Sequence, residues 1–316
     1  MQQELINKLC CPACSGRLLI NDGSLFCGKC SASYSVIQGR PVLVPNTMSA
    51  VKQSELIAAA EALLSFDSVQ TWGGGANTNV EDYYFNKLFP VFNKRDRHWA
   101  FLGRKVAEMV RAIPAGSEII DIGAGECKYG ALFPGCSYIA TDLVFSSDKH
   151  DFSRINVIAD AAAIPFKEAS FDVALNLAVM EHVPDPNLVI HEMARVLRPS
   201  GTAYALIPLV RPEHLVPYDF QRFTRYGIQQ LFTANGFKIE QIEGSNNALW
   251  TAVNYLSLYT KTTPLQKYGR RSIRGIFLNR MWATLLWPLI EYARLYDSSY
   301  PGDFPMYYWV RASKMY

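Results

Sequence analysis

The sequence of 316 residues lacks a strong excess of either charge, because 31 lysines and arginines are balanced by 28 aspartates and glutamates. A net charge of +3 gives no global field for binding a polyanion, so a nucleic-acid-binding role would need a local basic patch. The first residues, Met1 to Leu9, lack an apolar segment behind a basic start. With no secretory signal, we expect a cytoplasmic protein. Internal repeats and a low-complexity tail are also absent from the sequence.

Cysteine is scarce after the first thirty residues, where only Cys127 and Cys136 remain of the seven in the chain. In a reducing compartment, the crowding of the other five favours a metal site over disulfides. Four of them form two CxxC pairs, and four thiolates on two turns are what a closed, structural zinc site requires. A redox dithiol is the alternative for one pair, but the second pair argues against it. We therefore predict zinc ligands at Cys11, Cys14, Cys27 and Cys30, with Cys10 as a buried spare.

Residues 1–46 are predicted to form a compact β module, the zinc ribbon, which ends in the extended segment from Pro41 to Pro45. The stretch from Tyr34 to Val44 resembles the small zinc-ribbon family that includes activators of tRNA and protein methyltransferases. So short a module cannot bury an adequate core without metal. Residues 47–94 are predicted to be a helical linker, with a helix over 49–65.

From residue 95 to 316 the pattern alternates between helices and apolar strands, which predicts an α/β fold. Continuous apolar strands imply a parallel sheet covered by helices on both faces, with its ligand at the carboxyl ends of the strands. A helical insertion over about 246–304 precedes a last strand over 306–314. Its aromatic residues favour ordinary packing or a homo-oligomer contact over peripheral membrane contact, and its longest apolar run is too short to span a bilayer. The strands are expected at 118–121, 137–142, 156–160, 171–177, 202–208 and 237–243.

The strand Glu118–Asp121 runs into a glycine turn at Gly123 and Gly125, which we expect to open a helix. Glycines let a backbone approach a ligand closely, and a helix N-terminus offers free amides. The next two strands end in carboxylates, Asp142 and Asp160. Their oxygens are suited to accept hydrogen bonds from ribose hydroxyls and from an exocyclic adenine amine.

These segments, together with 164–166, 170–174, 181–186 and 192–201, resemble class I, Rossmann-like S-adenosylmethionine-dependent methyltransferases, in particular the broad family that includes ubiquinone-biosynthesis C-methyltransferases. The resemblance covers residues 95–245 and departs at Cys127, where the family often has a third glycine. It implies S-adenosylmethionine as cofactor. It also implies that Asp121, Gly123 and Gly125 line the methionine and ribose end, Asp142 the ribose, Asp160 and Ala161 the adenine, and Asn176 and Leu177 the floor beside the sulfonium.

Two alternatives compete for the glycine turn. A nicotinamide dehydrogenase would need glycine at Lys128, where helix and sheet pack closely, so that reading is the weaker. An inert α/β protein could use the glycines for a tight turn alone, but the two carboxylates that follow argue against it.

The acceptor side is predicted on the segment from His214 to Thr224, which follows a strand end and resembles a segment of small-molecule and surface-polysaccharide methyltransferases. His214 could act as a general base, because an imidazole titrates near neutrality. Equally, His214, Asp219 and Arg222 could brace the loop while Thr224 caps the next helix. His182 ranks below His214 as a base. Methyl transfer from a sulfonium needs little acid–base help.

The function we predict is O-methylation of a small-molecule or glycan precursor. The first alternative is an rRNA or tRNA methyltransferase whose ribbon grips RNA, although the ribbon has few cations and aromatics for that task. The second is a non-catalytic cofactor-binding or ribbon scaffold.

Overall fold

The computed structural model describes residues 3–45, 97–144, 151–253 and 304–316, with scattered positions between 255 and 293. The predicted linker at 47–94, with its helix at 49–65, lies outside the described residues. The same holds for most of the predicted insertion.

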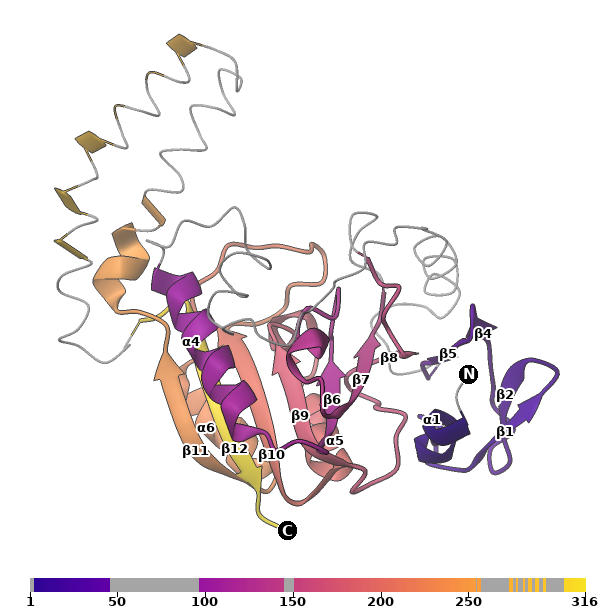
Figure 1. Cartoon of the computed structure of the whole chain (residues 1–316). Helices are drawn as coiled ribbons and strands as arrows, with labels where there is room; N and C mark the ends of the chain where they lie inside the picture. Colours follow the sequence, from indigo (N-terminus) through magenta and orange to yellow (C-terminus); the bar gives the residue numbers. More distant parts are fainter. Residues whose placement is uncertain are drawn as a thin grey trace.

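A nine-stranded sheet forms the centre of the chain, in the order β11-β12-β10-β9-β6-β7-β8-β5-β4 (Figure 1). The prediction of an α/β fold with alternating strands and helices is confirmed. Each expected strand is found, and β10 begins earlier than expected, directly after a helix. The bounds are β6 (Glu118–Ile122), β7 (Ser137–Asp142), β8 (Val157–Ala159), β9 (Phe171–Leu177), β10 (Leu197–Pro208), β11 (Phe237–Gly244) and β12 (Tyr307–Lys314).

The sheet is mixed, so the prediction of a parallel sheet is wrong for its last strand. Strand β12 runs antiparallel to both neighbours, with Ala205 of β10 and Ile242 of β11 both paired to Val310. The segment between β11 and β12 leaves and re-enters the sheet at the same end. A hairpin-like return of this kind gives an antiparallel strand and needs no crossover.

Helices cover both faces of the sheet, as predicted. Helix α4 (Arg97–Ala112) packs on one face, where Val106 and Met109 are buried against β9, β10 and β12. Helices α5 (Pro186–Val196) and α6 (Arg225–Ala234) pack on the other face, in a separate cluster of buried side chains. Thr224 caps α6 by accepting a hydrogen bond from the amide of Gly227 at 3.1 Å, which confirms the predicted cap.

The helix expected after the glycine turn is absent. Residues 124–129 form turns and are followed only by the single 3-10 turn η2 (Gly130–Leu132). The reason lies in the backbone, because Gly123, Gly125 and Cys127 all have positive φ, at 74°, 53° and 54°. A right-handed helix cannot continue through such residues. The free amides of a helix N-terminus are therefore not available at this turn.

The N-terminal module is divided between two sheets. Helix α1 (Gln3–Lys8) leads into a three-stranded sheet of β1 (Leu18–Asn21), β2 (Ser24–Cys27) and β3 (Ser33–Tyr34). Strands β4 (Val36–Ile37) and β5 (Arg40–Leu43) instead extend the large sheet, with Val42 paired to Ile158 of β8. The segment predicted to close the ribbon is thus part of the β4–β5 hairpin at one edge of the large sheet, while residue 46 as the boundary of the module stays a prediction.

The ribbon docks on the large sheet through backbone and side chains. The amide of Cys10 donates to the carbonyl of Pro165 at 3.0 Å, and the amide of Lys167 donates to that of Lys8 at 3.0 Å. Between these bonds Leu9 and Phe166 are buried in one hydrophobic core that runs from the ribbon into the main domain. We therefore expect the ribbon and the main domain to stabilise each other.

The described parts of the insertion are helical. Trp250 and Val253 pack with Ala293, which accounts for part of the insertion by ordinary packing. Ile273 and Phe277 are exposed. Oligomerisation or membrane contact through this segment stays a prediction. Within the described ranges, none of the helices is both long enough and apolar enough to cross a membrane.

Candidate functional site

A cavity of about 210 Å³ opens at the carboxyl ends of β6, β7 and β8. Strand β6 lies between β7 and β9, so the strand order reverses at this point, which is where open α/β sheets bind ligands. The walls come from the turn after β6, the ends of β7 and β8, the segment after β9 and the loop between β10 and α6. The lining residues are Gly123, Gly125, Asp142, Leu143, Ala159, Asp160, Ala161, Ala178, Val179, His182, Val183 and Leu215.

Gly123 allows the turn after β6 to touch the segment after β9. Its φ is +74°, and a Cβ added there would lie 2.4 Å from Cγ2 of Val179. No L side chain fits both conditions, so the close approach of the two segments depends on this glycine. Ala178 and Leu215, both with positive φ, also line the cavity. Strained backbone of this kind persists where the surroundings hold it, and it gathers at functional sites.

Asp142 is held by the glycine turn at the end of β7. One carboxylate oxygen accepts a hydrogen bond from the amide of Gly125 at 2.9 Å, and the other accepts from the amide of Val144 at 2.7 Å. These two hydrogen bonds orient the carboxylate, and a carboxylate oxygen can accept more than one hydrogen bond. A Cβ at Gly125 would meet nothing within 4 Å.

Asp160 and Ala161 line the cavity one strand further along. The carboxylate of Asp160 accepts a hydrogen bond from the amide of Ala162 at 2.8 Å, which fixes its orientation. Asp160 is 6% exposed, so little water would separate its carboxylate from a group bound in the cavity. Two oriented carboxylates, Asp142 and Asp160, therefore stand on neighbouring strand ends, as the sequence predicts.

Three other predicted cofactor residues are not among those that line the cavity. Asp121 is buried, and its carboxyl accepts a hydrogen bond from the hydroxyl of Tyr138. Burial raises the pKa of Asp121 to about 7, against the lowering effect of Tyr138. Asn176 is buried, and its Oδ1 has no hydrogen-bond partner among the described residues, while Leu177 is partly buried against the core. The floor of the cavity is formed by the next two residues, Ala178 and Val179.

The structure brings the two predicted histidines together. Their ring centroids lie 4.7 Å apart with the planes at 74°. His182 comes from the 3-10 turn η3 (Met180–His182) and lines the cavity, whereas His214 comes from the loop between β10 and α6 and lies beside it. Burial lowers the pKa of both imidazoles, which favours the neutral form of each.

Glu181 completes this cluster and was not singled out from the sequence. It is fully buried, and neither carboxylate oxygen has a hydrogen-bond partner among the described residues. Burial raises its pKa to about 7. Its Oε1 lies 3.8 Å from Nε2 of His182 and 3.8 Å from Nε2 of His214. In the sequence, only the adjacent pair Glu181-His182 pointed to this cluster. Nothing in the sequence indicated that His214 would lie beside that pair.

The loop between β10 and α6 is braced as the alternative reading of its motif predicts. Arg222 donates to both oxygens of Asp219, at 2.6 and 2.8 Å, and the amide of His214 donates to the same carboxylate at 2.9 Å. Phe220 also donates its amide to the carbonyl of Glu181 at 2.8 Å. This bracing positions His214 over η3.

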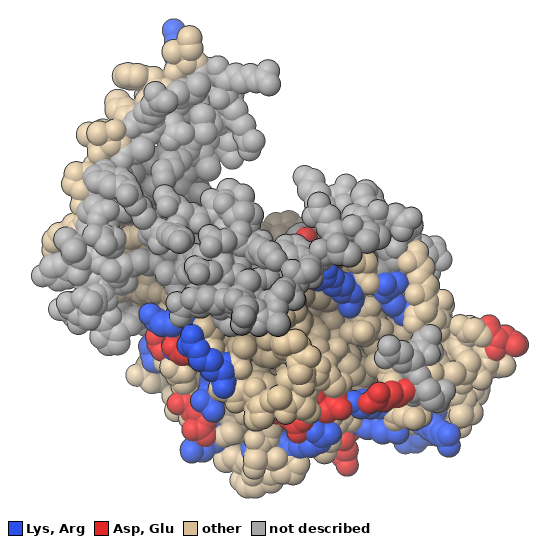
Figure 2. Space-filling view, in the orientation of Figure 1, with Lys and Arg blue, Asp and Glu red and all other residues tan. Residues whose placement is uncertain are grey.

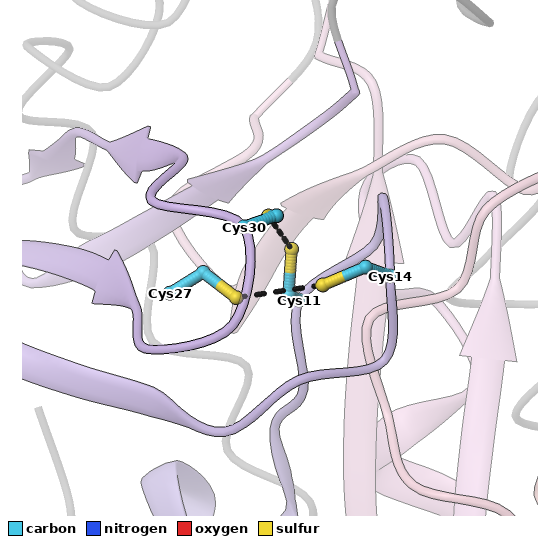
Figure 3. Close-up of side chains that lie close together, drawn as sticks. All are labelled: Cys11, Cys14, Cys27 and Cys30. Carbon is cyan, nitrogen blue, oxygen red and sulfur yellow. Dashed lines mark hydrogen bonds between the residues drawn. The ribbon is translucent and has the colours of Figure 1, made fainter.

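The four predicted cysteine ligands converge in the ribbon (Figure 3). The sulfurs of Cys11 and Cys30 lie 3.7 Å apart and those of Cys14 and Cys27 3.5 Å apart. Zn–S bonds of about 2.3 Å in a tetrahedron separate the sulfurs by about 3.8 Å, so the cluster has the dimensions of a structural metal site.

The surroundings of the cysteine cluster also fit a metal. The amide of Lys29 points at the sulfur of Cys27 at 3.4 Å, as in turns that stabilise thiolates. A Cβ at Gly16 would lie 2.9 Å from the same sulfur, so glycine leaves the space the cluster needs. Cys10 is buried outside the cluster, as predicted, and burial raises the pKa of its thiol to about 11.

Comparison with known proteins finds similarity in the central region. Residues 120–205 match the family described as a methyltransferase domain. Over 102 residues the chain is 35% identical to a tRNA (carboxymethyluridine(34)-5-O)-methyltransferase of Arabidopsis thaliana, and the match covers 31% of this chain and 25% of that protein. Over 173 residues it is 28% identical to a fatty-acid O-methyltransferase of Mycolicibacterium smegmatis, covering 49% of this chain and 60% of that protein.

The chain thus spans a quarter to three fifths of these two relatives. Among solved structures, phosphoethanolamine N-methyltransferase 2 of Haemonchus contortus, in complex with phosphomonomethylethanolamine and S-adenosylhomocysteine, superposes with a TM-score of 0.41 at 16% identity. That superposition covers 69% of this chain and 52% of the other.

Proposed function

We propose that the central region, in which residues 120–205 match a methyltransferase domain, is a class I methyltransferase domain of the S-adenosylmethionine-dependent kind, and that the protein transfers a methyl group to an oxygen atom of a small-molecule or glycan precursor. The observation that carries this proposal is the cavity at the strand-order reversal, with oriented carboxylates of Asp142 and Asp160 on adjacent strand ends. Both relatives named above are O-methyltransferases, which favours oxygen as the acceptor atom.

The residues of the cavity fit the proposed cofactor. The carboxylate of Asp142 can accept hydrogen bonds from ribose hydroxyls, and Asp160 with Ala161 offers an acceptor and a small side chain beside an adenine. Gly125 leaves open space where a side chain would intrude. When bound, S-adenosylmethionine would supply both the activated methyl group and its leaving group.

The chain's own contribution to methyl transfer is chiefly alignment. Val179 and Leu215 narrow the cavity with apolar side chains, which exclude water from the reacting groups. His182 stands on the wall of the cavity with Glu181 and His214 directly behind it. We propose that this cluster faces the acceptor oxygen.

We further propose zinc as the metal of the four-cysteine cluster. Four thiolates leave no open coordination position, so the role of the ion would be structural. A ribbon this small would depend on the ion for folding.

An RNA acceptor is the second candidate, and the match to the tRNA methyltransferase supports it. On the face shown in Figure 2, the Lys and Arg side chains of the described residues alternate with Asp and Glu. A mixed surface of this kind favours a small acceptor over an extended polyanion.

Calorimetry with S-adenosylmethionine tests the cofactor assignment. We expect binding by the full chain and at least tenfold weaker binding by Asp142→Ala, because a charge-assisted hydrogen bond contributes about 1.5–3 kcal/mol. Glu240→Ala, on the edge strand β11 at the far side of the sheet, serves as the matched control and should bind as the wild type does. Undiminished binding by Asp142→Ala would contradict the assigned site, and no heat with the wild type would favour a scaffold.

The acceptor class requires a product assay. Cell extract incubated with the protein and cofactor carrying an isotopically labelled methyl group should yield label in small molecules or glycan precursors, detected by mass spectrometry. Label that appears in RNA alone, with RNA binding that weakens steeply as salt rises, would establish the second candidate instead.

A further inference from the structure

The backbone fixes the protonation pattern of the two clustered histidines. Nδ1 of His182 lies 2.6 Å from the carbonyl oxygen of Tyr218, and Nδ1 of His214 lies 3.1 Å from that of Pro212. A carbonyl oxygen only accepts, so each Nδ1 carries the proton and donates it. Each Nε2 of a neutral imidazole is then left with a lone pair.

Both lone pairs face the same carboxylate oxygen. Nε2 of His182 and Nε2 of His214 are each 3.8 Å from Oε1 of Glu181, and the three atoms lie within 4.8 Å of one another. The carboxylate is fully buried and bonded to no other described residue. Three electron-pair donors that converge on one point form an arrangement that a cation stabilises.

We infer that Glu181, His182 and His214 form a binding site for a divalent first-row transition metal ion, separate from the cysteine cluster. Two imidazoles and a carboxylate are a ligand set that such ions prefer. Bonds of about 2.1 Å in a tetrahedron separate ligand atoms by about 3.4 Å, so the site closes from 3.8 Å with small side-chain movements.

The outer contacts are those of a metal site. Histidine ligands commonly donate their other ring N–H to a backbone carbonyl or a carboxylate, which fixes the tautomer and orients the ring. Both histidines do so here, and Nδ1 of His214 also lies 3.3 Å from Oδ2 of Asp219. Of the neighbouring cations, Arg222 is paired with Asp219 and Arg211 donates to the hydroxyl of Tyr307.

The position of the site gives the ion a function. Three protein ligands leave a coordination position open, and His182 lines the cavity proposed for the cofactor. An acceptor oxygen bound there would lose its proton more readily through the Lewis acidity of the ion. The two histidines then act as ligands, since an Nε2 that binds the metal cannot also take up a proton.

Cobalt binding by the purified full chain tests the inference without cofactor or turnover. With zinc retained in the ribbon, we expect titration with Co²⁺ to add one cobalt per chain, with weak visible absorption and no intense sulfur-to-cobalt band. Glu181→Gln and His214→Ala should each bind Co²⁺ at least tenfold more weakly while keeping one zinc per chain. His191→Ala, at an exposed position on α5, is the matched histidine control and should bind as the wild type does.

Metal analysis and near-ultraviolet circular dichroism show whether each variant is folded. No cobalt uptake by the wild type beyond exchange into the ribbon would overturn the inference. Unchanged uptake by folded Glu181→Gln and His214→Ala would overturn it as well. Because the assay contains no S-adenosylmethionine, its failure is distinguishable from failure of the proposed methyl transfer.

Discussion

The ammonium group of Lys8 lies 2.6 Å from the carboxylate of Glu118, so the helix that precedes the ribbon is tied to the first residue of the central strand β6. Both side chains are about one fifth exposed, at 20% and 21%. This ion pair lies beside the two backbone hydrogen bonds across the same interface, in which Cys10 donates to Pro165 and Lys167 donates to Lys8. The ribbon is therefore docked on the sheet by more than apolar contact.

A double-mutant cycle on Lys8→Ala and Glu118→Ala should give a coupling energy of about 0.5–1 kcal/mol at pH 7. Burial raises the pKa of Glu118, but the hydrogen bond and charge of Lys8 outweigh burial, and the net pKa is lowered. A lowered carboxyl pKa stabilises the folded state above the unfolded-state pKa and loses that effect as pH falls. Denaturant unfolding at pH 7 and pH 3 should show weaker coupling at the lower pH; equal coupling at both would refute the charge interaction.

Removing one thiolate should release the metal and unfold the ribbon. For Cys14→Ser we expect one fewer zinc per chain by elemental analysis, and a lower Tm for the whole protein because the ribbon shares a core with the main domain. Limited proteolysis should cut within residues 3–45. Cys136→Ser, outside the cluster, is the matched control. A variant that keeps its zinc would show that the cluster is not the metal site.

Gly123→Ala should destabilise the protein and weaken cofactor binding, because the new Cβ meets Val179 at 2.4 Å. Gly236→Ala is the matched control, since its φ is +78° and a Cβ there meets nothing within 4 Å. The control should cost about 1 kcal/mol for backbone strain alone, and Gly123→Ala about 2–4 kcal/mol. Combining Gly123→Ala with Val179→Ala should restore part of the loss. Equal losses at the two glycines would show that contact with Val179 is unimportant.

Asp121→Asn should stabilise the protein increasingly as pH rises. Burial raises the folded-state pKa of Asp121 from 3.8 to about 7, so the carboxyl binds its proton more tightly when folded. The free energy of unfolding of the wild type then falls between about pH 4 and pH 7 and levels off above. The increase in the free energy of unfolding that Asp121→Asn gives over the wild type should grow over that range to at most about 4 kcal/mol. Urea unfolding at pH 4.5, 6 and 8 measures it, with Asp22→Asn in the exposed β1–β2 turn as control; a difference independent of pH would contradict the prediction.

The elements of the fold follow from local sequence. Continuous apolar runs predict strands such as Phe171–Leu177, and the segments between them predict helices such as Arg225–Ala234, to within a residue or two. Prediction from local sequence fails where a single backbone torsion decides the secondary structure, as at Cys127. Its positive φ replaces the expected helix with turns, and no local pattern of apolar residues signals it.

Local patterns also do not predict which strands pair when they are far apart in the chain. Strands β4 and β5 join the large sheet because Val42 of β5 pairs with Ile158 of β8. This pairing depends on where the ribbon docks on the main domain. The antiparallel direction of β12 follows from the end of the sheet at which the chain returns.

The sequence by itself determined the chemistry that its local spacing encodes. The two CxxC pairs specify four thiolates on two turns, and the strand ends at Asp142 and Asp160 specify two acids at one edge of a sheet, because neighbouring parallel strands end on the same side. Only the tertiary structure decided that Glu181, His182 and His214 meet. Their convergence depends on the loop between β10 and α6 folding over η3, which long-range hydrogen bonds and packing hold in place.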